Sequence, residues 1–356
     1  MPFGPSTSLR TGSARDRRLL LSLVALVPLV AFAQDGIPAK RPAPFLRGMC
    51  LTLQDDDPDH EYATEVAEIA SRLEASHVSV VFHLFQPRAD SPAPARGDQT
   101  PTDAALRRVL RAARQHGLET LLMPIVLIEE PRPSEWRGKL APPDADAWLT
   151  AYRSLVLEYA KLAEEEKVSV LCVGSELGWS QKNALWRTII KDVRAAFSGK
   201  LIYSANWDDY ENVPFWDVLD WVGLSGYYEL APALDAPDEK LRVGWTRARD
   251  AILAWRAKAA PGKALVFTEV GYASQRGCSV HPWDYTKAGR PDADEQRRCY
   301  EAFMAVWART LELQGVFFYE WWGEGGSDDR GYTPRDKPAE TVIRRFFSDL
   351  RVVERR

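Results

Sequence analysis

The stretch from Val170 to Gly178, with the sequence VLCVGSELG, decides how the rest of the chain is interpreted. An apolar run meets Gly174 and Ser175 and then Glu176. A continuous apolar run of this length is typical of a strand that is buried on both faces, as in a parallel sheet. Amphipathic helical patterns flank it, at Asp144–Glu166 before and Gln181–Phe197 after. The stretch therefore predicts one strand of a βα repeat, with its apolar run at Val168–Val173 and a carboxylate at its carboxyl end.

The same alternation continues in both directions along the chain. Further strand-like runs lie at Leu46–Leu53, Val78–Phe85, Leu118–Ile128, Lys200–Ala205, Trp221–Ser225, Ala264–Thr268 and Gly315–Tyr319. Further helical patterns lie at Glu61–Ala75, Thr102–His116, Glu239–Ala259, Ala293–Leu313 and Lys337–Leu350, with a short piece near Phe215–Leu219. Eight such units predict an α/β fold, a single (β/α)8 TIM barrel over residues 46–350. The alternative is an open doubly wound sheet, but no GxGxxG motif follows the first strand, as a dinucleotide-binding version requires.

The first residues have the pattern of a secretory signal. Three arginines between residues 15 and 18 precede the apolar run Leu19–Ala33, which ends in the small-x-small sequence Ala31-Phe32-Ala33. This pattern predicts a signal peptide over residues 1–33. A Pro-rich lead-in over residues 34–45 follows, and the mature protein is expected to be secreted or periplasmic. The alternative is a membrane anchor, although the run is shorter than the ~20 residues that span a bilayer.

Composition and residue spacing exclude several classes of function. The chain has 356 residues, 46% of them hydrophobic, and a net charge of -4, so it is neither disordered nor suited to nucleic acid. The five histidines lack ligand spacing, and we expect no metal and no cofactor. Cys50 and Cys172 lie in apolar runs and should be buried thiols, whereas Cys278 and Cys299 flank one loop and could pair. We expect a monomer that does not associate with membranes after signal cleavage.

A second apolar run also ends in a carboxylate, at Glu269. A barrel brings the carboxyl ends of its strands to one mouth, so Glu176 and Glu269 should face each other there. Burying two carboxylates is costly, and neither has a cation beside it in the sequence. Paired carboxylates are the apparatus of glycoside hydrolysis, in which one protonates the leaving oxygen and the other acts in its ionised form. A separation of about 5 Å predicts retention of configuration, and a wider one predicts inversion.

Other strand ends supply polar and aromatic side chains suited to a sugar. Amide groups can hydrogen-bond sugar hydroxyls, and indoles can stack on pyranose rings. Tyr227 could donate to an ionised Glu269 and hold it in place. Thirteen tryptophans and twelve tyrosines fit such a ligand, although packing is the alternative for each tryptophan. The candidates at the strand ends are His83, Gln86, Asn206, Trp207, Tyr227 and Trp321.

Several motifs in this order resemble glycoside hydrolase family 113. They are the segments 173–177, 204–208, 215–227 and 267–272, together with Gln86, Trp136, Pro282-Trp283, Gln296 and Lys337-Pro338-Ala339. The resemblance runs from about Arg47 to Ala339 and implies a retaining (β/α)8 glycosidase of endo-β-1,4-mannanase type. It implies that Glu176 is the general acid/base and Glu269 the nucleophile. It also supports Trp136, Asn206, Trp207 and Tyr227 as substrate-binding residues.

The sequence departs from the pattern of this family, or of its wider clan, at three strand ends. Ser175 is a further candidate for substrate contact, because it stands where the wider clan has Asn and the family has a small hydroxyl residue. His83-Leu84-Phe85 replaces an expected aromatic pair, and Tyr319 replaces an expected Trp. These changes leave the chemistry intact and bear on which sugar is bound. We therefore predict a secreted retaining glycosidase for β-1,4-mannan or a related β-linked glycan. The alternatives are a catalytically silent carbohydrate-binding barrel and a glycosidase or transglycosylase for a different β-glycan.

Overall fold

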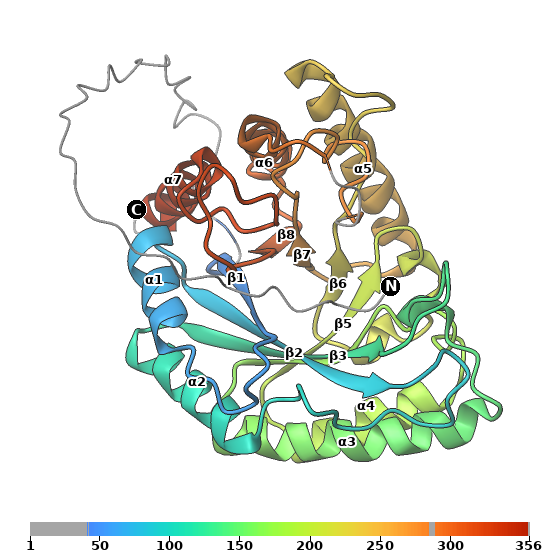
Figure 1. Cartoon of the computed structure of the whole chain (residues 1–356). Coiled ribbons are helices and arrows are strands. Elements are labelled where there is room, and N and C mark those ends of the chain that lie inside the picture. Colours follow the sequence, from blue (N-terminus) through green and yellow to red (C-terminus); the bar gives the residue numbers. More distant parts are fainter. Residues whose placement is uncertain (1–40, 42, 285–288, 355–356) are drawn as a thin grey trace.

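The strands form one closed parallel barrel. The computed structural model describes residues 41, 43–284 and 289–354. Within them, each strand pairs in parallel with the next and β8 pairs with β1 (Figure 1). The predicted TIM barrel is confirmed. The strands are β1 (Leu46–Leu53), β2 (His77–Gln86), β3 (Glu119–Ile128), β4 (Val170–Ser175), β5 (Lys200–Asn206), β6 (Val222–Ser225), β7 (Leu265–Val270) and β8 (Leu313–Phe318).

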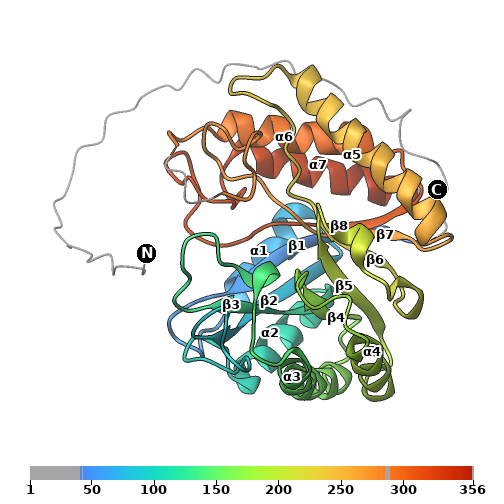
Figure 2. The same cartoon turned by 90° about the vertical axis from the view of Figure 1, so that its right-hand side faces the viewer.

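The helices lie outside the strands and cover the barrel (Figure 2). The expected helix near Phe215–Leu219 is instead a pair of short 3-10 turns, η3 (Tyr210–Asn212) and η4 (Trp216–Val218). Pro214 lies between them, and a proline cannot donate the backbone hydrogen bond that would continue a helix. The helices are α1 (Ala63–Leu73), α2 (Asp103–Gln115), α3 (Ala145–Glu165), α4 (Leu185–Ala196), α5 (Asp238–Ala259), α6 (Ala293–Trp307) and α7 (Pro338–Glu354).

Alternating side chains fill the two sides of the barrel wall. In β2, Val80, Phe82 and Leu84 belong to the large core between strands and helices, whereas Val81 belongs to the cluster inside the barrel. Cys50 and Cys172 are also inside and fully buried, as predicted. Because both faces of each strand are buried, the strands are nearly continuous apolar runs, which is why their positions are visible in the sequence.

The predicted signal peptide is not tested by the structure, and the predicted pairing of Cys278 with Cys299 is not present in it. The proposed signal peptide (1–33) lies outside the described residues, as does the lead-in (34–45) apart from residues 41 and 43–45. Cys278 and Cys299 are both buried and are free thiols in the structure. In the described part of the chain, no helix is long and apolar enough to cross a membrane.

Candidate active site

A break in strand pairing places Glu176 at the barrel mouth. The register between β4 and β5 shifts between Cys172 and Ser175, and Glu176 itself has a left-handed backbone with φ of 53°. Few non-glycine residues adopt this conformation, and irregularities of this kind re-aim side chains next to active sites. The Glu176 N–H donates to the Ser204 carbonyl at 2.8 Å, which fixes the turn. The strained turn therefore directs the Glu176 side chain out of the strand pattern.

Glu176 has a cation and a hydroxyl as partners. Nη2 of Arg137 lies 2.7 Å from its Oε2, and the Ser225 hydroxyl donates to its Oε1. Arg137 belongs to the 3-10 turn η2 (Arg137–Lys139) in the β3–α3 loop, and its guanidinium is mostly buried. The ion pair therefore joins this loop to the end of β4.

Glu269 lies within β7, also beside shifts in register. The register between β6 and β7 shifts between Leu224 and Ser225. The register between β7 and β8 shifts between Phe267 and Val270. The Tyr227 hydroxyl donates to Oε2 of Glu269 at 2.7 Å, as predicted from the sequence. Oε1 is buried and has no partner. One carboxyl oxygen is thus held in place while the other is free to react or to accept a ligand.

The two carboxyl groups lie close enough to influence each other. Burial is the main cause that raises the pKa of Glu269, to about 7, and the negative charge of Glu176 acts in the same direction. Arg137 and the Tyr227 hydroxyl act in the opposite direction, because they favour the charged form. A carboxyl group with this pKa changes charge near neutral pH, which is typical of a catalytic group.

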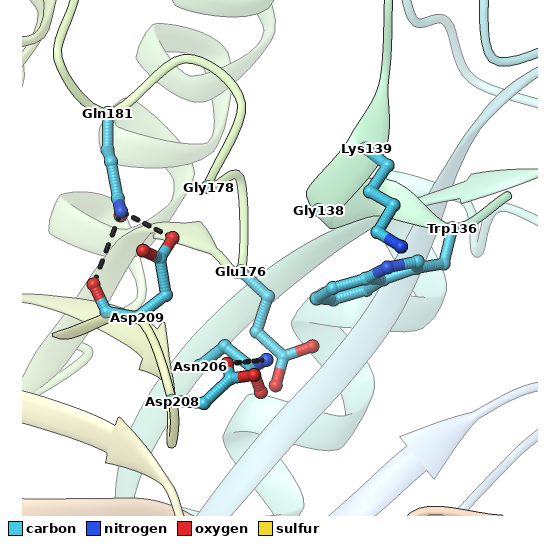
Figure 3. A pocket seen from close by; sticks show the side chains of 9 residues that line it. All are labelled: Trp136, Gly138, Lys139, Glu176, Gly178, Gln181, Asn206, Asp208 and Asp209. Carbon is cyan, nitrogen blue, oxygen red and sulfur yellow. Dashed lines mark hydrogen bonds between the residues drawn. The ribbon is translucent and has the colours of Figure 1, made fainter. Parts of the chain in front are cut away.

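A pocket opens beside Glu176, between the β3–α3 and β5–β6 loops. Figure 3 shows the Glu176 carboxylate between the Trp136 indole and Asn206. Asn206 donates to Asp208 at 2.7 Å, and both side chains are partly or fully accessible. The lining residues are Trp136, Gly138, Lys139, Glu176, Gly178, Gln181, Asn206, Asp208 and Asp209. The pocket therefore combines an aromatic face with amide and carboxylate groups, which is the chemistry that binds a hydroxylated ring.

A second aromatic surface lies on the Glu269 side. Trp207 stacks on Trp283 with ring centroids 5.6 Å apart and contacts Tyr228 edge-on. It also packs against the small cluster that contains Tyr227 and Tyr332. Trp283 is 40% exposed, so part of this stacked pair faces solvent and is available to a ligand.

His83 lies near Arg137, and Ser175 is the last residue of β4, directly before Glu176. Burial and the nearby Arg137 lower the pKa of His83 to about 4, so its imidazole is neutral at physiological pH. The Ser175 hydroxyl is buried without a partner. His83 can therefore act as a neutral hydrogen-bonding group, whereas the structure buries Ser175 beneath the site.

Two predicted substrate-binding residues are instead committed to packing. Gln86 is fully buried, where its amide nitrogen donates to the Arg88 carbonyl at 2.6 Å and its oxygen accepts from Trp148 at 2.8 Å. Trp321 is also fully buried, with its indole N–H on Glu68 and two arginines against its ring. Neither side chain has a face left for a sugar, so the structure gives both a structural role in place of the predicted one.

Gln86→Ala is accordingly expected to cost stability and to leave substrate affinity unchanged. The substitution leaves the buried Trp148 N–H without an acceptor, which costs about 1–3 kcal/mol. Thermal unfolding of the variant and the wild type should show a lower Tm. A raised KM at an unchanged Tm would instead mean that Gln86 contacts substrate.

The sequence did not single out Arg137 or Glu320 as members of the site. Arg137 lies in a loop, where neighbouring sequence does not show that its side chain turns toward Glu176. Glu320 follows β8 and is buried, with Oε2 unpartnered. Its position in the sequence could have indicated Glu320, because a carboxylate that closely follows a barrel strand is expected at the barrel mouth.

The fold and the paired carboxylates are those of a glycosidase, and comparison with known proteins agrees. Residues 56–336 match the model of Glycoside Hydrolase Family 113, which is most of the chain. The chain belongs to glycoside hydrolase family 113. No curated protein matches it by sequence.

Solved structures of family 113 enzymes share the whole fold. One is the β-mannanase AaManA from Alicyclobacillus acidocaldarius in complex with ManMIm, with 27% identity and a TM-score of 0.76 over 87% of this chain and 99% of that one. A second, a GH113 β-1,4-mannanase solved as a complex, has 25% identity and a TM-score of 0.76 over 86% and 99%. A β-glucuronidase from Ruminococcus gnavus, 12% identical with a TM-score of 0.56 over 85% of this chain and 49% of that one, shares the barrel fold alone.

Proposed function

We propose that this glycoside hydrolase is a retaining β-1,4-mannanase, or acts on a closely related β-linked glycan. The observation that carries the mechanism is the pair of carboxyl groups at the barrel mouth, Glu176 and Glu269, each with different partners. The mannan assignment rests on the solved β-mannanases to which the chain is similar.

In the proposed mechanism, Glu269 attacks the anomeric carbon while Glu176 protonates the leaving oxygen. The Tyr227 hydroxyl holds Oε2 of Glu269 and leaves Oε1 free for the attack. Glu176 then takes a proton from a water molecule whose oxygen bonds to the anomeric carbon, and the bond from that carbon to Glu269 breaks, which releases the sugar with overall retention. In the structure Glu176 is paired with Arg137, so we infer that on substrate binding Glu176 takes up a proton and exchanges this ion pair for a hydrogen bond to the leaving oxygen.

The aromatic groups at the mouth suit a polymeric substrate. Trp136 lies beside Glu176, on the side that the leaving group would occupy, and the Trp207–Trp283 pair is placed near Tyr227 and Glu269. Indoles stack on the apolar faces of pyranose rings, so the two surfaces could bind sugars on either side of the cleaved bond. We further propose that the protein is exported, on the basis of the N-terminal signal pattern.

The substrate is tested by products formed from a panel of polysaccharides. The purified chain from Gln34 onward would be incubated with β-1,4-mannan, glucomannan, cellulose, xylan and mannohexaose. We expect short manno-oligosaccharides from the mannans. Cleavage of another polymer would replace the substrate and keep the mechanism. Binding without any cleavage would favour the catalytically silent barrel.

The rate should fall on the acid side as pH drops through about 7. Glu269 must be ionised to attack, and its pKa of about 7 means that it becomes protonated below that pH. Tyr227→Phe removes a donor that lowers this pKa, so the acid limb of kcat/KM should move to higher pH. A profile of kcat/KM against pH for both proteins measures this. A limb that Tyr227→Phe leaves unmoved would contradict the assignment.

A further inference from the structure

Glu320 is a third buried carboxylate at the barrel mouth, and the mechanism above does not use it. It follows the end of β8 at Phe318, and its side chain is only 8% exposed. Its Oε2 is buried and has no hydrogen-bond partner. Among the described residues, no Lys, Arg or His forms an ion pair with it. A buried carboxylate with one unpartnered oxygen and no cation beside it costs free energy, so Glu320 requires a reason to be there.

Buried glutamates with a structural role in this protein are fully provided with donors. Glu166, 4% exposed, forms ion pairs with Arg107 and Arg111. Glu295, 5% exposed, accepts from the Gly277 N–H at 2.7 Å and from Ser279. Glu320 has only the hydroxyls of Thr52 and Tyr319 beside it, and its Oε2 has no partner. In this respect it resembles Glu269, whose Oε1 also has none. Glu320 therefore resembles the candidate catalytic residue Glu269 more than it resembles the structural glutamates Glu166 and Glu295.

The surroundings of Glu320 place it next to Glu269. Its negative charge contributes to raising the pKa of Glu269 and that of Cys50 inside the barrel. The hydroxyls of Thr52 and Tyr319 lie beside it and favour its charged form, whereas burial raises its pKa to about 7. The charged and titratable groups that face it are Glu269 from β7, Cys50 from β1, Tyr319 from the end of β8 and Asp329 from the β8–α7 loop.

The strand order decides which sugar Glu320 can reach. β8 lies between β7 and β1, so Glu320 is beside the strand of Glu269 and across the barrel from β4 and Glu176. If Glu176 protonates the leaving group, the leaving group lies on the β4 side. The sugar that becomes bonded to Glu269 then lies on the side of Glu320.

We propose that Glu320 is a specificity residue that accepts hydrogen bonds from hydroxyl groups of the sugar attacked by Glu269. The inference rests on the proposed roles of Glu176 and Glu269. Its ligand class is a β-linked sugar whose hydroxyls on that side are unsubstituted, because a carboxylate left without a donor disfavours a deoxy or acetylated sugar. The free Oε2 supplies the acceptor, and the bound hydroxyl offsets the cost of burying it.

The test pairs Glu320 variants with sugars that lack one hydroxyl. The substrates are aryl β-glycosides of the sugar that the wild type cleaves, and their mono-deoxy analogues at the ring bonded to the aryl group. With the intact sugar, Glu320→Ala should lower kcat/KM about 10- to 100-fold, and Glu320→Gln should lower it less, because the amide oxygen still accepts. With one deoxy analogue, the wild type should already be slow, and Glu320→Ala should cause little further loss.

Two controls keep this test separate from folding and from the proposed function. Glu166→Gln alters another buried glutamate, far from the mouth, and should lower Tm without changing kcat/KM of the folded protein. A wild type that cleaves neither an aryl glycoside nor any polysaccharide of the panel would mean that the proposed function fails. The same deoxy series would then be compared by calorimetric binding. An equal loss in Glu320→Ala for every deoxy analogue, at an unchanged Tm, would overturn the proposal in either format.

Discussion

Glu269→Gln is expected to lower kcat on β-1,4-mannan by about four orders of magnitude or more, with the fold intact. The amide cannot form the covalent bond to the anomeric carbon, so the double displacement loses its first step. The side chain is nearly isosteric, and it removes a buried group whose ionisation burial disfavours, so Tm should not fall. Steady-state rates and thermal unfolding of both proteins measure the two effects.

Chemical rescue by azide tests whether Glu269 acts as the nucleophile or has another role in the site. In Glu269→Ala, azide can enter the vacated space and attack the anomeric carbon from the same face, which gives a glycosyl azide of inverted configuration. Glu166→Gln serves as the control for the loss of a buried glutamate elsewhere in the fold. Near-normal turnover by Glu269→Gln would remove it from the role of nucleophile.

Glu176→Gln is expected to have an effect that depends on the leaving group. On mannan, whose leaving oxygen needs a proton, kcat should fall about 10²- to 10⁴-fold. On an aryl glycoside with an acidic phenol, the first step needs no proton, so the glycosyl-enzyme should form and accumulate. A pre-steady-state burst of phenol followed by slow turnover is therefore expected. Equal losses on both substrates, without a burst, would show that Glu176 is not the acid/base.

The parts of this protein that the sequence predicts well are those in which neighbouring residues carry the information. The barrel strands are continuous apolar runs because both of their faces are buried, and β1 was predicted at its observed bounds, Leu46–Leu53. Glu176 and Glu269 are visible for the same reason, since each interrupts such a run near its end. The partner of Glu269 could also be predicted, because Tyr227 follows the adjacent strand β6.

The parts that could not be predicted depend on how loops fold back over the mouth. Gln86 ends β2, but its amide hydrogen-bonds to the Arg88 carbonyl in the following loop and to the Trp148 indole of α3. The alternation of residues along the strand does not reveal these two contacts. Trp321 turns away from the cleft because it packs between Arg72 and Arg335. Arg137 reaches Glu176 only through the path of the β3–α3 loop. Beyond the last residue of a strand, tertiary contacts set the direction of each side chain. The spacing of residues in the sequence therefore does not predict that direction.

The central claim, a double displacement by Glu176 and Glu269, is tested most directly by the configuration of the first product. Proton NMR of the anomeric region would follow mannohexaose during the first turnovers, before mutarotation mixes the anomers. The account predicts that the new reducing ends appear as the β-anomer and convert to the α-anomer only later. New reducing ends that appear first as the α-anomer would contradict it, because a single displacement by water would then be at work.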